Sequence, residues 1–77
     1  MTNQDILDAV PRIAKERNSS EHDVAVNMIF FAYPAKQDMK NMLNYAMLIR
    51  RLEQKFGVTE EEARTVANEA EYANSVL

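Results

Sequence analysis

The sequence contains no cysteine and only one glycine, and these absences exclude several classes of protein. Without cysteine the chain can form neither a disulfide nor a thiolate metal site. A phosphate-binding loop needs several glycines in a short stretch, which this chain cannot supply. No apolar run reaches the roughly 18 residues of a membrane span, and the N-terminus lacks a basic and then apolar signal. We therefore expect a cytoplasmic protein without a membrane partner.

Histidine is as scarce as glycine, because His22 is the only one. No Ser, Asp or Glu accompanies it at catalytic spacing, so we interpret it as a solvated residue in the first turn of a helix. Glu60, Glu61 and Glu62 are consecutive. They point to different faces of a helix and do not converge on a metal. We expect a non-enzymatic protein with no catalytic residue, cofactor, metal or small-molecule substrate.

The residues that are present suit a small helical domain. Hydrophobic residues make up 47% of the 77 positions, and they include five Met, three Phe and three Tyr. A chain of this length buries only about 60–65% of its unfolded surface and is marginally stable alone. Because disulfides are absent, oligomerisation is the remaining common source of stability. The sequence thus predicts one domain over residues 1–77 that forms a homodimer, binds another protein, or does both.

The stretch Asp38–Phe56 is predicted to be a long and central helix. A stripe at spacings of three and four identifies it; the stripe consists of Met42, Tyr45, Ile49, Leu52 and Phe56. Further apolar residues on both flanks, Leu48 among them, widen the apolar arc to roughly 260° of the helical wheel. An arc this wide predicts neighbours on at least two sides of the helix, and some of them can belong to a second copy of the chain.

The end of this helix is marked by Gly57, which is expected to adopt a left-handed conformation just past the last helical residue. Thr59 is placed to cap the next helix, and Glu62 completes a capping box three residues later. Val58 and Ala63 occupy the positions of a hydrophobic staple. The sequence therefore predicts a tight corner here.

Residues 3–17 have a helical pattern that Pro11 interrupts. Proline in a helix interior removes a hydrogen bond and costs about 3 kcal/mol. We expect one helix that is kinked or broken at Pro11, the alternative being a short first turn followed by a second helix that starts near Asp8.

A second helix is predicted after Ser20, which can cap it. Its apolar segment, Val24–Tyr33, is expected to end where Pro34 disfavours an α conformation at Tyr33. The next helix then follows directly, or the two form one sharply kinked helix. A last helix runs from about Glu60 to Ser75. The expected fold is thus an all-α, compact four-helix domain.

The corner resembles the helix–turn–helix pattern of DNA-binding proteins. The resemblance covers about 20 residues: Leu52–Phe56, the turn Gly57-Val58-Thr59, and the apolar positions Ala63 and Val66. It implies a DNA-binding regulator. The sequence departs from the pattern at Glu53, where a small residue is usual, and in the acidic start of the following helix. Because DNA readers need cations to neutralise phosphates, we expect no direct contact with nucleic acid.

Charge is unevenly distributed along the chain. Residues 1–58 carry eight Lys or Arg against seven Asp or Glu, whereas residues 59–77 carry one Arg against five Glu. A basic stripe of Lys40, Arg51 and Lys55 is expected on the polar arc of the central helix. An acidic partner, or the acidic last helix of a second copy, would complement this stripe.

The concentration of Met and aromatic residues near the middle of the chain is the strongest functional indication, because such residues are enriched at interfaces. We predict a small interaction or regulatory module that self-associates through a helical Met and aromatic surface. The alternative is a nucleic-acid-related regulator, either the DNA binder above or an acidic decoy that inhibits a nucleic-acid-binding protein. The predicted partner-binding residues are Phe30, Phe31, Tyr33, Met39, Met47, Arg51, Glu60 and Glu61.

Overall fold

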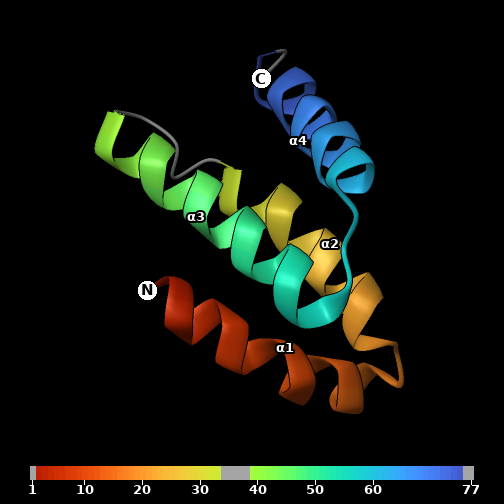
Figure 1. Ribbon diagram of the computed structural model, residues 1–77. Coiled ribbons are helices and arrows are strands. Elements are labelled where there is room, and N and C mark those ends of the chain that lie inside the picture. Colours follow the sequence, from red (N-terminus) through yellow and green to blue (C-terminus); the bar gives the residue numbers. More distant parts are fainter. Residues whose placement is uncertain (1, 34–38, 76–77) are drawn as a thin grey trace.

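The computed structural model describes residues 2–33 and 39–75, and this part of the chain contains four α-helices (Figure 1). They are α1 (Asn3–Arg17), α2 (Glu21–Ala32), α3 (Met39–Phe56) and α4 (Glu60–Ser75). No strand occurs among these residues. The predicted all-α four-helix domain is confirmed.

Helix α1 runs without interruption through Pro11. A capping box fixes its start, in which the Asp5 N–H donates to Thr2 Oγ1 over 3.2 Å and the Thr2 N–H donates to Asp5 Oδ2 over 2.9 Å. Pro11 itself is exposed, so its ring does not disturb the packed side of the helix. A break at Pro11 and a second helix starting near Asp8 are therefore both wrong. Burial of one stripe offsets the cost of the proline, and that stripe consists of Leu7, Val10 and Ala14.

Helix α2 packs against all three other helices and is the most enclosed element. Figure 1 shows it behind α3, with α1 below and α4 above. Ser20 caps it as predicted, because its side chain accepts a hydrogen bond from the Asp23 N–H over 3.0 Å. The sequence predicts α3 as the central helix, and α3 does contact each of the others. However, α1 and α4 both pack more extensively on α2 than on α3.

The end of α2 departs from the expectation for Tyr33. The last helical residue is Ala32, yet Tyr33 keeps right-handed helical angles of φ −57° and ψ −43°. A following proline disfavours the α conformation of the preceding residue but does not forbid it. Here the Tyr33 N–H bonds to the Phe30 carbonyl, and the Tyr33 ring packs edge-to-face on Tyr45 at a centroid distance of 5.7 Å. Residues 34–38, and with them the predicted role of Pro34, lie outside the described residues.

The corner between α3 and α4 has the predicted geometry. Gly57 adopts a φ of +73° and donates its N–H to the Glu53 carbonyl over 3.1 Å. No atom lies within 4 Å of a Cβ built on Gly57, so the backbone conformation rather than space selects glycine. Thr59 and Glu62 exchange two hydrogen bonds of 3.0 Å each, which completes the capping box.

The core lies where α2 meets the inner sides of the other helices. Leu48 and Leu52 of α3 are buried, and the Tyr45 hydroxyl donates to the Ile29 carbonyl of α2 over 2.7 Å. The predicted stripe on α3 is therefore partly wrong. Leu48, expected on a flank, faces the core, whereas Met42, expected in the stripe, is half exposed. The buried side chains of the core cluster are Leu7, Val10, Ala14, Val24, Ala25, Ile29, Tyr45, Leu48, Leu52, Val58 and Ala63.

Candidate interaction surface and the His22 corner

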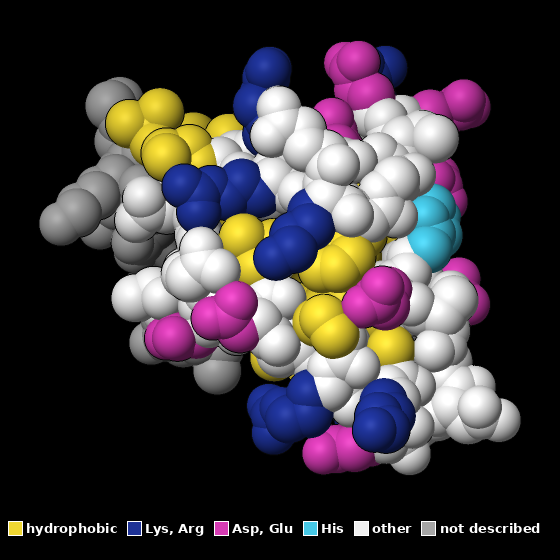
Figure 2. Space-filling model, turned by 60° about the horizontal axis from the view of Figure 1, so that its bottom comes forward, with side chains coloured by type: hydrophobic (Ala, Val, Ile, Leu, Met, Phe, Trp, Pro, Cys, Tyr) yellow, Lys and Arg dark blue, Asp and Glu magenta, His cyan; other side chains and the backbone are white. Residues whose placement is uncertain are grey.

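The side of α3 that points away from the core is apolar over its N-terminal half. Leu43 is 63% exposed, Met47 is 54% exposed and Met42 is 50% exposed. Ala46 and Arg50 are exposed on the same side of the helix. We call these five residues the outer face of α3. Figure 2 shows hydrophobic side chains gathered toward the end of the molecule where α3 begins, with Lys and Arg side chains beside them.

A hollow of about 480 Å³ lies beside this face, between the start of α1 and the middle of α3. The Asn3 side chain closes part of it by donating from Nδ2 to the Asn44 carbonyl over 3.0 Å. Met47 belongs to both the hollow and the outer face, so the two surfaces are continuous. The remaining lining residues are Thr2, Gln4, Ile6, Ala32, Tyr45, Leu48 and Arg51.

The predicted basic stripe of α3 is engaged locally instead of forming one converging cluster. Arg51 donates from Nη1 to Gln4 Oε1 of α1 over 3.4 Å. The Lys55 ammonium lies 5.8 Å from the centroid of the Phe56 ring, within cation–π range. The side chain of Lys40 lies outside what the structure describes. Arg51 and Lys55 are both exposed, and Arg51 also lines the hollow beside the outer face of α3.

The predicted aromatic cluster divides between inside and outside. Phe30 and Tyr33 are half-buried, whereas Phe31 is 70% exposed and meets the Phe30 ring edge-to-face at 5.9 Å. Phe31 continues an exposed stripe of α2 whose other members, Asp23 and Asn27, are polar. The side chain of Met39 lies outside the described part. Among the predicted Met and aromatic residues whose side chains the structure describes, Met47 falls on the outer face of α3, whereas Phe30, Phe31 and Tyr33 do not.

The charged side chains of helix α4 are acidic apart from Arg64. Arg64, its only cation, forms an exposed ion pair of 3.2 Å with Glu60. Its outward stripe is exposed and carries no cation; the stripe consists of Glu61, Thr65, Asn68 and Tyr72. The helix–turn–helix-like corner therefore gains no support as a DNA reader. No group of three potential metal-binding side chains occurs within residues 2–33 and 39–75.

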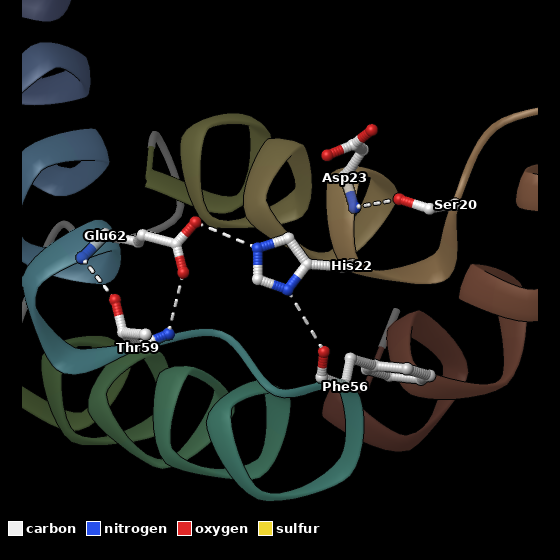
Figure 3. Close-up of polar contacts among 6 residues, drawn as sticks. All are labelled: Ser20, His22, Asp23, Phe56, Thr59 and Glu62. Carbon is white, nitrogen blue, oxygen red and sulfur yellow. Dashed lines mark hydrogen bonds and ion pairs between the residues drawn. The ribbon is translucent and has the colours of Figure 1, made fainter.

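His22 lies in the first turn of α2 as predicted and its side chain is 37% exposed, but it has partners that the sequence did not reveal. Its Nε2 lies 2.9 Å from Glu62 Oε2, and its Nδ1 lies 3.3 Å from the Phe56 carbonyl oxygen (Figure 3). The half-buried ring therefore joins the first turn of α2 to the α3–α4 corner. The partners are 34 and 40 residues distant in sequence, so no local pattern could indicate them.

The two members of this pair shift each other's ionisation. The hydrogen bond to Glu62 is the largest of the effects that raise the pKa of His22. The backbone N–H of Thr59 is the largest of the effects that lower the pKa of Glu62, and the hydrogen bond to His22 comes next. Both shifts favour the charged forms, so below the raised pKa of His22 the contact is an ion pair of imidazolium and carboxylate.

Comparisons with known proteins identify no relative of this chain. No protein-family model, no curated protein and no solved structure matches it. Among the helices of residues 2–33 and 39–75, none combines the length and the apolar character needed to cross a membrane. Function must therefore be inferred from the outer face of α3 and from the His22 corner.

Proposed function

We propose that the protein is a non-enzymatic interaction module that forms a homodimer through the outer face of α3. The observation that carries the proposal is the exposure of Leu43 and Met47, which are both more than half open to solvent on one side of one helix. Single exposed apolar residues are ordinary, whereas contiguous apolar faces bordered by polar residues are typical of interfaces. Arg50 and Arg51 supply such a polar border at the C-terminal end of this face.

The outer face of α3 is also suited to packing on itself. In an antiparallel pair with the twofold axis between Ala46 and Met47, each Leu43 would face Arg50 of the other copy. The aliphatic stem of Arg50 can cover Leu43 while its guanidinium stays in water. Ala46 allows the two helices to approach closely, and the flexible Met47 fills the space on either side. No unpaired charge would be buried at the centre of this arrangement.

Sedimentation equilibrium at several concentrations, in low and in high salt, tests the proposal. The wild type is expected to be a dimer that persists in high salt, because an apolar interface is not screened. Met47→Gln and Leu43→Gln are each expected to raise the dissociation constant about 10- to 30-fold, as for a central interface residue. Tyr72→Gln is the matched control, since Tyr72 is 71% exposed but lies on α4.

Circular dichroism of each variant verifies that the helices are retained before the dissociation constants are compared. A wild type that is monomeric at every concentration would refute the proposal. So would a dimer that Met47→Gln weakens no more than Tyr72→Gln does, because the interface would then lie elsewhere.

A further inference from the structure

The polar contacts of His22 require two protons on one imidazole ring. The Phe56 carbonyl oxygen and the Glu62 carboxylate oxygen can only accept hydrogen bonds. They lie on opposite ring nitrogens, at 3.3 Å from Nδ1 and 2.9 Å from Nε2 (Figure 3). A neutral imidazole carries one N–H and can serve only one of these acceptors. Both contacts exist together only when the ring is an imidazolium.

We propose that His22 is a pH-sensitive latch between α2 and the α3–α4 corner. As an imidazolium it binds Phe56 and Glu62 at once, and after losing a proton it releases one of them. None of the three residues belongs to the outer face of α3, so the latch does not depend on the proposed dimer. It controls the only corner of the described chain that contains a glycine.

The elements packed around the ring act in different directions. Helix α4 contributes the Glu62 carboxylate, and α3 contributes the carbonyl of its last residue, where the helix dipole favours a cation. Asp23, next to His22 on α2, also favours the charged ring. The N-terminus of α2 and partial burial oppose the charge. The hydrogen bond to Glu62 outweighs them, so the pKa of His22 lies above its ordinary value of 6.5.

The direction of each shift fixes the pH range in which the latch is closed. A raised pKa means that the His22 contribution is fully present below the ordinary value of 6.5 and is lost as the pH rises through the folded value. A lowered pKa means that the Glu62 contribution is present above the ordinary value of 4.5 and is lost as the pH falls through the folded value. The corner is therefore held most firmly between these two ordinary values and loosens toward alkaline pH.

Opening the latch also changes the charge of a neighbouring hollow. Glu62 lines a space of about 320 Å³ between α2 and α4, together with Glu61, Val26 and Val66. While His22 is protonated, the ion pair neutralises Glu62. After deprotonation the Glu62 carboxylate is left without its counter-charge and adds to that of Glu61. The state of one histidine thus sets the charge at the edge of this hollow.

A two-bond ¹H–¹⁵N NMR titration can test the latch directly, because His22 is the only histidine and its signals are unambiguous. In the wild type the His22 pKa is expected to exceed 6.5, with both ring nitrogens protonated below it. Glu62→Gln keeps a side chain that can accept the Thr59 N–H bond but removes the carboxylate charge. It should lower the His22 pKa toward the ordinary value. Glu61→Gln, the matched control, removes an adjacent carboxylate that does not bond to His22 and should have the smaller effect.

Amide hydrogen exchange supplies the structural readout. After correction for intrinsic exchange rates, the protection of the amides of residues 57–62 should fall between about pH 5.5 and about pH 8. The amides of α1 should not follow this change, and His22→Gln should abolish it. A wild-type His22 pKa at or below 6.5 would overturn the proposal. Equal effects of Glu62→Gln and Glu61→Gln, or protection of the corner that does not vary with pH, would do the same.

Discussion

Helices α2 and α3 are both apolar over a wide arc, but the chain covers them to different extents. On α2, the neighbours α1, α3 and α4 enclose Val24, Ala25 and Ile29, none of which is more than 5% exposed. On α3, the same arrangement buries Leu48 and Leu52 but leaves the outer face open. The difference shows that the width of an apolar arc predicts how many neighbours a helix requires. It does not say whether those neighbours belong to the same chain.

The strongest test of this contrast compares two leucines on opposite sides of α3. Leu52 is 0% exposed and Leu43 is 63% exposed. Leu52→Ala leaves a cavity and should lower the free energy of unfolding by about 2–5 kcal/mol. Leu43→Ala should change it by less than about 0.5 kcal/mol when the protein is dilute enough to be monomeric. Urea titrations followed by circular dichroism measure both values.

A comparable loss in the two variants would contradict the contrast. It would mean that the outer face of α3 is covered within a single chain, and α3 would then resemble α2. The substitution is the same in both variants and the helix is the same, so helix propensity cancels in the comparison.

Local interactions account for the parts of the fold that could be predicted from sequence. The Ser20 cap, the left-handed Gly57 and the capping box of Thr59 and Glu62 each depend on residues no more than four positions apart. Such hydrogen bonds form wherever the chain starts or stops a helix, with little influence from distant segments. The start of α2, the end of α3 and the start of α4 were therefore predicted correctly.

Orientation and long-range pairing could not be predicted in the same way. A wide apolar arc on α3 has no single preferred direction, so the sequence favoured Met42 over Leu48 for the core. The packing of α1 and α2 against one side of α3 determines that Leu48 is buried and Met42 is not. His22 meets Phe56 and Glu62 only because the fold brings the start of α2 to the α3–α4 corner. From the local sequence alone, His22 is a first-turn residue, Phe56 ends a helix and Glu62 belongs to a capping box, so none of them indicates this contact.

The hydrogen bond from Tyr45 to Ile29 tests the buried contact between α3 and α2. Tyr45→Phe removes a buried donor 2.7 Å from the carbonyl of α2 and should cost about 0.5–1.5 kcal/mol of the unfolding free energy. Tyr72→Phe is the control, because Tyr72 is exposed on α4 and should have no measurable effect. Both values come from the same urea titrations. Equal stability of the two variants would show that this hydrogen bond does not help to join α3 to α2.

The same tyrosine gives an independent readout at alkaline pH. Burial raises the pKa of Tyr45 to about 12. This pKa lies above the ordinary value of 10. The neutral Tyr45 side chain therefore contributes to the free energy of unfolding below pH 10, and this contribution is lost as the pH rises through the folded value. Stability of the wild type should therefore decline more steeply above pH 10 than that of Tyr45→Phe.

The smallest expected effect concerns Phe31, the one large apolar side chain that α2 leaves exposed. Because Phe31 continues a stripe with Asp23 and Asn27, we place it outside the dimer interface. Phe31→Ser should change the dissociation constant less than about threefold, a shift below the size of a central contact. Sedimentation equilibrium beside Met47→Gln measures the difference. If Phe31→Ser weakens the dimer as much as Met47→Gln does, the interface includes α2. Helix α2 would then, like α3, have an apolar surface that its own chain leaves uncovered.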